Sequence, residues 1–284
     1  MMKLKTLVAA VVALGSVSSA NAFFLYPGTN TIEDDNREYL IKGDNNTATD
    51  TIEVGDSLRG VIKFSAINQE SAPYGSQSPI LPELTGVFQT QVLAITDLKG
   101  DGSANDIIWG SNASFAATYG AGAMVALYTG GSVLDIQACS SIANCEAAAI
   151  DGALWAVAGF GDADDQWVSF DSNLNWGVVT GLSSATKVAA VNYALSILTN
   201  NTGYSFYEVD LDCTSVGGPF ACSGDGKTDL NGSGDVLGGR NLANGYGARS
   251  DIDVTLNVIP EPASLALLGL GLVGLGFTKR RRTT

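Results

Sequence analysis

The chain has 284 residues, of which 45% are hydrophobic and 34 are glycine, and it carries a formal net charge of −14 with no histidine. The absence of histidine excludes Ser-His-Asp and Cys-His catalytic arrangements, so acid–base chemistry would fall to carboxylates. The acidic balance argues against nucleic acid or an anionic membrane surface as a partner.

The first 22 residues have the pattern of a secretory signal peptide. Two lysines form a positive n-region before the apolar run 7–14, and a small-residue cleavage site follows with Ala20 and Ala22. We therefore expect export through the Sec translocon and a mature chain that begins at Phe23.

Residues 23–257 show hydrophobic side chains at alternate positions or in short runs between Gly, Asn, Asp and Ser clusters, which is typical of β-strands. The clearest strand is 250–258, where Ile252, Val254 and Leu256 alternate with polar residues. The other predicted strands are 57–66, 86–95, 123–129, 154–160, 166–170, 187–198 and 205–211. This pattern predicts one antiparallel β-sandwich domain of jelly-roll-like topology.

One helix is predicted at 140–150, where alanines raise the helix propensity. The alternative for this segment is a loop closed by a disulfide. The four cysteines form two local pairs, Cys139 with Cys145 and Cys213 with Cys222, although four cysteines allow three connectivities. We expect local pairing in an oxidising compartment.

Three acidic clusters contain the oxygen ligands that calcium prefers. The favoured candidate comprises Asp225, Asp229, Asn231 and Asp235, whose glycine neighbours let a loop wrap back, although it lacks the residue order of an EF-hand. The other clusters lie at 97–106 and 162–165. An acidic surface turn is the favoured interpretation of each cluster, and calcium binding is the alternative. Structural calcium is the one cofactor that the sequence suggests.

Three tryptophans offer a second candidate surface, because sugars bind flat on exposed aromatic faces. Trp155 is predicted to lie in the core. Trp167 and Trp176 have polar neighbours, and we consider them as half-exposed carbohydrate-binding residues. Core packing is the favoured interpretation of both.

A three-part signal occupies residues 258–284. Proline on each side of Glu261, in Pro260-Glu261-Pro262, favours an extended peptide that suits a protease cleft. The apolar run 263–277 is predicted to form a short helix of about 22 Å, which enters but poorly spans a hydrocarbon core of about 30 Å. A basic stop that stays on the cytoplasmic side follows: Lys279, Arg280, Arg281 and Arg282.

This order of motif, apolar helix and basic end resembles the PEP-CTERM sorting signal of Gram-negative bacteria. The resemblance implies transient insertion of the tail into the inner membrane, processing by an exosortase, and delivery to the cell surface or extracellular matrix. Exosortases are membrane-embedded, cysteine protease-like enzymes. A simple membrane anchor is the alternative for this tail, and no resemblance extends to 23–257.

The tail therefore indicates an exported, non-enzymatic surface or matrix protein, and the resemblance implies an association with exopolysaccharide, biofilm or floc. Without both signals the body keeps 9 cations and 28 anions, a net charge of −19, which again argues against nucleic acid. The alternative is a secreted polysaccharide-binding module or a carboxylate-dependent glycoside hydrolase. A row of exposed tryptophans would favour the binder, and two carboxyl groups in an open groove would favour the hydrolase.

Overall fold

A computed structural model describes residues 25–43, 49–69, 76–77, 83–211 and 224–259. It is 52% strand and 12% helical, so the predicted mainly β class is confirmed. The predicted signal peptide, the C-terminal tail from Pro260 and the pair Cys213 and Cys222 lie outside the described residues. Within the described residues, no helix is long and apolar enough to cross a membrane.

The strands follow one another along most of the chain. They are β1 (Gly28–Ile41), β2 (Ser57–Gln69), β3 (Ser76–Gln77), β4 (Leu84–Thr96), β5 (Asp106–Ser111), β6 (Ala123–Thr129), β7 (Ala153–Gly159), β8 (Gln166–Phe170), β9 (Lys187–Asn200), β10 (Val209–Asp210), β11 (Lys227–Thr228), β12 (Leu230–Gly238) and β13 (Ala248–Val258). The helices are α2 (Ala113–Tyr119), α3 (Ile142–Ala149), α4 (Trp176–Gly181) and the 3₁₀ turn η1 (Ala243–Gly245).

The main sheet closes on itself into an eight-stranded antiparallel barrel, so the predicted β-sandwich is wrong. Around the barrel the order is β1, β13, β12, β9, β7, β6, β4 and β2, and β2 pairs again with β1. The predicted strand 205–211 is confirmed only in part: β10 forms at its end and pairs with β11 in a separate ladder, and Phe206 makes an isolated bridge to Val258.

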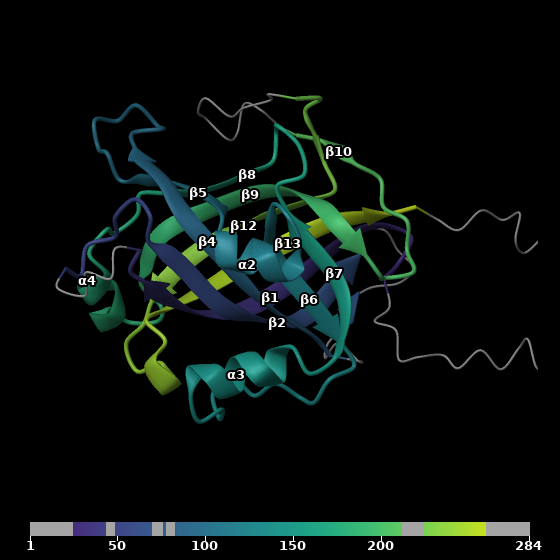
Figure 1. The fold of residues 1–284 in the computed structure, drawn as a ribbon, viewed down its shortest axis with the longest axis horizontal. Coiled ribbons are helices and arrows are strands. Elements are labelled where there is room, and N and C mark those ends of the chain that lie inside the picture. Colours follow the sequence, from purple (N-terminus) through teal and green to yellow (C-terminus); the bar gives the residue numbers. More distant parts are fainter. Residues whose placement is uncertain (1–24, 44–48, 70–75, 78–82, 212–223, 260–284) are drawn as a thin grey trace, which may run out of the picture.

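Two long strands complete the closure by changing partners along their length. The first half of β4 pairs with β6 and its second half with β5. The first half of β9 pairs with β8 and its second half with β7. The wall between β4 and β9 is therefore built by β6 and β7 at one end of the barrel and by β5 and β8 at the other (Figure 1).

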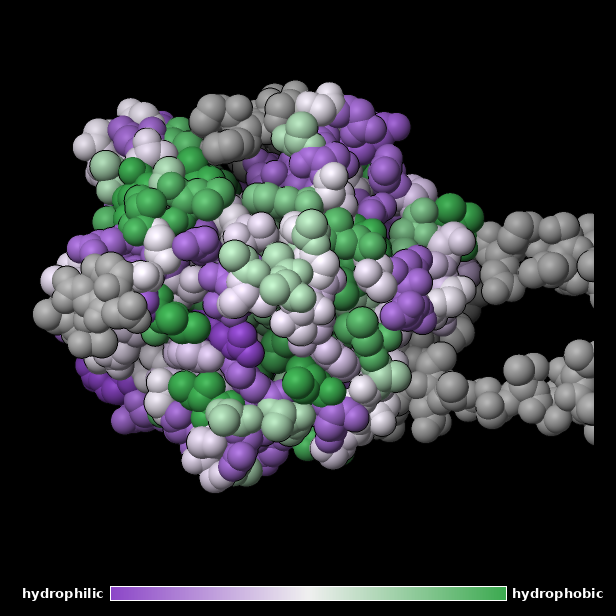
Figure 2. All heavy atoms as spheres, viewed as in Figure 1, coloured by the Kyte–Doolittle hydropathy of each residue, from purple (hydrophilic) through white to green (hydrophobic). Residues whose placement is uncertain are grey.

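The apolar residues form two main clusters on opposite sides of the barrel wall. The larger fills the interior, where Trp167 stacks on Phe88 with ring centroids 5.9 Å apart and contacts Tyr193 at 4.9 Å. The second lies between the outer face of the sheet and α2 and α3, and it includes Phe115 and Cys145. Figure 2 shows hydrophobic and hydrophilic side chains interspersed over the face that carries these helices. Helices thus cover the apolar part of the outer wall.

The predicted helix and disulfide at 139–150 are both confirmed. Helix α3 begins after Ser141, whose hydroxyl accepts a hydrogen bond from the N–H of Asn144 at 3.3 Å. Cys139 and Cys145 are bonded to each other, and the Cys145 side chain is fully buried against the barrel. The disulfide therefore fixes the start of α3 on the outer wall.

Replacing both Cys139 and Cys145 with serine is expected to lower the free energy of unfolding by about 2 kcal/mol, because the short loop regains its freedom in the unfolded chain. Urea unfolding of the oxidised protein and the double variant measures this difference. Equal midpoints for the two proteins would contradict the expectation.

Both ends of the described barrel lie at the same end of the molecule. Gly28, at the start of β1, pairs with Val258, at the end of β13. The loop that carries α4 lies at the opposite end, where β9 and β13 begin (Figure 1). The last described residue, Ile259, therefore follows β13 at the end of the barrel away from α4.

Candidate functional site

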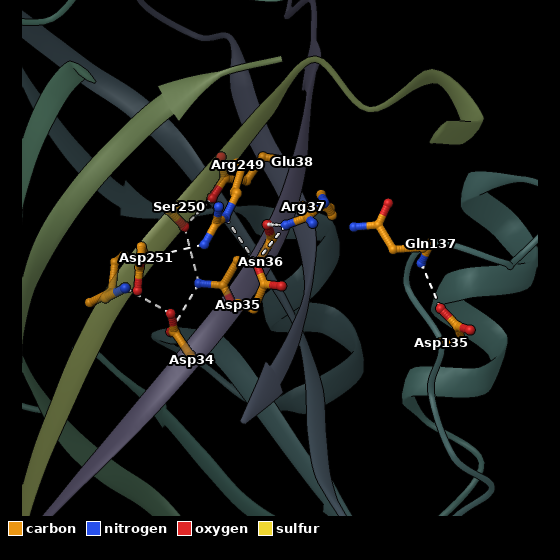
Figure 3. A network of polar contacts seen from close by, with 11 residues as sticks. Asp34, Asp35, Asn36, Arg37, Glu38, Asp135, Gln137, Arg249, Ser250 and Asp251 are labelled. Atoms are coloured by element: carbon orange, nitrogen blue, oxygen red, sulfur yellow. Dashed lines mark hydrogen bonds and ion pairs between the residues drawn. The ribbon is translucent and has the colours of Figure 1, made fainter. Parts of the chain in front are cut away.

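The inner face of β1 carries polar side chains in an otherwise apolar barrel. Asp34, Asn36 and Glu38 occupy alternate positions, so all three point inward, and they are only 6%, 3% and 1% exposed. Ser250 of β13 lies beside them and is 2% exposed. Figure 3 shows these four side chains, which we call the acidic row, between β1 and β13.

A chain of hydrogen bonds joins the acidic row. Asp34 accepts one from the N–H of Ile252 at 2.8 Å and another from the Asn36 amide at 2.9 Å. The same Asn36 amide donates to the Ser250 hydroxyl at 3.0 Å, and that hydroxyl donates to Oε1 of Glu38. Asn36 Oδ1 and Glu38 Oε2 have no hydrogen-bond partner among the described residues. The row thus has two buried acceptors left over.

The neighbouring cations lie on the outer face of the same strands. Arg37 contacts Asp35 at 2.6 Å, and Arg249 contacts Asp35 at 3.0 Å. Across the described part of the chain, no ion pair includes Asp34 or Glu38. The two acids inside the barrel therefore have no counter-ion there.

Burial controls the protonation of the interior acids. It raises the pKa of Glu38 to about 7, although the hydrogen bond from Ser250 and the charge of Arg37 oppose the shift. Burial also raises the pKa of Asp34 well above its usual range, against the hydrogen bonds from Ile252 and Asn36. Glu38 is consequently the acid that changes its charge near neutral pH.

The acidic row faces a cavity of about 80 Å³ inside the barrel. Aromatic side chains line much of the remaining wall, including Trp109, Trp167 and Tyr193. Towards the α4 end, Ser172 and Trp176 line it. Since one water needs roughly 10–15 Å³, the space is larger than a single water requires.

The favoured calcium cluster does not form the predicted loop. Asn231 and Asp235 lie on strand β12, where four residues span about 13 Å. Asp229 accepts a hydrogen bond from the N–H of Ile197 at 2.7 Å, and Asp235 pairs with Lys187 at 2.6 Å. Within the described ranges, no group of three acidic, cysteine or histidine side chains is placed to hold a metal ion. Calcium binding by this segment stays a prediction.

The other two acidic clusters stabilise turns. Asp97 accepts hydrogen bonds from the N–H groups of Asp101 and Gly102 at 3.0 and 2.8 Å. In the third cluster, Asp164 accepts one from the N–H of Lys227 at 3.0 Å. The cluster at 162–165 thus contacts the favoured calcium segment at Lys227. Their separation in the sequence did not indicate this contact.

The tryptophans differ from one another in exposure. Trp155 is buried as predicted, at 4% exposed. The favoured core position of Trp167 is confirmed and its half-exposed alternative is wrong, because the ring is 8% exposed and stacked inside the barrel. Trp176 is partly buried against the core at the start of α4. A flat exposed row formed by Trp167 and Trp176 is therefore absent.

The acidic row was not among the sites predicted from the sequence. The segment 33–38 reads Glu-Asp-Asp-Asn-Arg-Glu, which is typical of a solvated loop. Its inward side chains become recognisable only through the pairing of β1 with β13 and β2, which joins segments far apart in the chain. The alternation of hydrophobic residues, the strongest strand signal, gives no indication here.

Comparison with known proteins identifies only the tail. A family model described as the PEP-CTERM protein-sorting motif matches residues 258–282, which confirms the predicted resemblance. No curated protein and no solved structure matches the chain. The motif indicates an exported protein that an exosortase sorts to the cell surface or extracellular space, and here it follows a β-barrel body without an assigned family.

Proposed function

We propose that this protein is a non-enzymatic component of the cell surface or extracellular matrix, associated with exopolysaccharide, biofilm or floc, and that the barrel is the cargo of the sorting signal. The position of the boundary between the barrel and the sorting signal supports this proposal. The sorting match begins at Val258, which is the last residue of β13. Cleavage within Pro260–Pro262 would therefore remove no described strand.

The C-terminal strand β13 is paired on both sides within the barrel. β13 pairs with β1 on one side and with β12 on the other, so it is an interior strand of the closed sheet. Beyond it, the N–H of Ile259 donates to the carbonyl of Ser205 at 2.8 Å. All of these contacts are made by residues before Pro260, so cleavage in the motif keeps them and the barrel is expected to stay folded.

The features expected of the alternatives receive less support. Trp167 offers no exposed face for a sugar. Asp34 and Glu38 face a cavity of about 80 Å³, which is below the roughly 300–1,000 Å³ of typical small-molecule sites and does not admit a polysaccharide chain. These points favour a structural role over a glycoside hydrolase or a sugar-binding module.

Deleting Pro260–Pro262 is expected to leave the protein in the inner-membrane fraction with its tail attached, because the exosortase then lacks its motif. Fractionation and immunoblotting measure this. A chain without Thr283 and Thr284, which lie beyond the matched residues, is the control and should be released normally. Normal release of the motif deletion would contradict the proposed sorting.

A further inference from the structure

The two unpartnered acceptors of the acidic row indicate what the cavity would bind. Asn36 Oδ1 and Glu38 Oε2 are buried, and both side chains line the cavity. They lie two residues apart on one face of β1, about 7 Å along the strand. Ser250 hydrogen-bonds to both residues. When Glu38 is ionised both free atoms are acceptors, so the complementary group must donate at least two hydrogen bonds.

The charge of the cavity wall favours a cation. Asp34 and Glu38 are the charged residues among those that line it, and no lysine or arginine joins them. The closest arginines on these strands, Arg37 and Arg249, contact Asp35 on the outer face instead. A buried carboxylate without a counter-ion is costly, so a bound cation would stabilise the ionised form of Glu38.

The remaining wall favours an organic cation over a metal ion. Trp109, Trp167 and Tyr193 supply aromatic surface that attracts ammonium groups and packs against alkyl chains. A calcium ion would need six to eight oxygen ligands, which this mostly apolar wall does not provide. The volume of about 80 Å³ limits the ligand to a few carbon atoms.

We propose that the barrel interior is a binding site for a short primary alkylammonium ion. Its ammonium group donates to Glu38 and Asn36, and its alkyl chain lies among the aromatic side chains. The site is independent of the sorting signal and of the structural role proposed above.

Calorimetric titration of the whole exported protein with n-alkylammonium chlorides, from methyl to hexyl, tests the proposal at pH 8 and 150 mM salt. We expect one-to-one, saturable binding with a maximum at a short chain length. The matched n-alcohols, which lack the charge, should bind at least tenfold more weakly. Equal affinity for amines and alcohols, or heat without saturation, would overturn the proposal and leave the cavity to water.

Two variants and a control locate the site. Glu38→Gln is expected to weaken alkylammonium binding at least tenfold. Asp251→Asn removes an exposed acid from the outer face of β13 and should bind as the wild type does, which separates the cavity from general attraction to an acidic surface. If Glu38→Gln does not fold, Ala158→Val narrows the cavity while keeping every carboxylate, and it should also weaken binding. Wild-type affinity in the folded cavity variants would contradict the assignment.

Discussion

Replacing Trp167 with alanine is expected to lower the free energy of unfolding by about 3–5 kcal/mol, the range for removing a large aromatic side chain from a core. The ring stacks on Phe88 and makes a tilted contact with Tyr193 inside the barrel. Its removal would leave a void that the closed sheet cannot easily collapse to fill. Chemical denaturation followed by circular dichroism measures the loss.

Two control variants compare the loss at Trp167 with the loss at less buried positions. Trp176→Ala should cost less, because that ring is only partly buried at the barrel end. Val133→Ala, at a side chain that is 78% exposed, should stay within about 0.5 kcal/mol of the wild type. A Trp167 variant as stable as the Val133 variant would mean that the ring is not part of the core and would revive the sugar-binding interpretation.

Raising the pH from 5 to 8 is expected to lower the free energy of unfolding by on the order of 3 kcal/mol, because Glu38 ionises inside the barrel. Burial raises its pKa from the ordinary value of 4.5 to about 7, so between these values the folded protein binds more protons than the unfolded chain does. The contribution of Glu38 to the free energy of unfolding is therefore fully present below about pH 4.5 and is lost as the pH rises through 7. Asp34, whose pKa is also raised, acts in the same direction.

The Glu38→Gln variant isolates this effect from that of the other acids. Near pH 4.5 the wild-type side chain is protonated and close to glutamine in shape and charge, so the two proteins should be about equally stable. Near pH 8 the variant should be the more stable one by about 3 kcal/mol, since it never ionises. Thermal unfolding at several pH values compares them. A constant difference across this range would show that Glu38 does not titrate as described.

The sequence predicts local elements well because their signals are local. The alternation that indicated 250–258 corresponds to β13, and the limits 123–129 and 166–170 are those of β6 and β8. The helix and disulfide at 139–150 also depend on neighbouring residues, namely the alanine run and two cysteines six residues apart.

The closure of the barrel could not be predicted from the same signals. A sandwich and a barrel both alternate hydrophobic and polar residues, and they differ only in which distant strands pair. The glycines and acidic residues of strand β12 indicate a turn or a calcium loop in the sequence. In the structure Gly232 is required by the Tyr193 ring, since a Cβ there would lie 2.2 Å from that ring. The partner that explains this glycine lies on β9, far away in the sequence.

The acidic row shows the same limit at the candidate site. Its residues look solvated in the sequence, and only pairing with β13 and β2 turns alternate members of the run inward. The sorting motif is the opposite case. Its three parts are contiguous, so one sequence was enough to identify it.

The intact mass of the protein recovered from the cell exterior shows whether an exosortase sorts the barrel as cargo. We expect a chain that begins at Phe23, keeps β13 and ends within Pro260–Pro262, with or without an added group. A secreted or surface form whose mass still includes Arg282 would contradict this expectation and would make the tail a simple anchor.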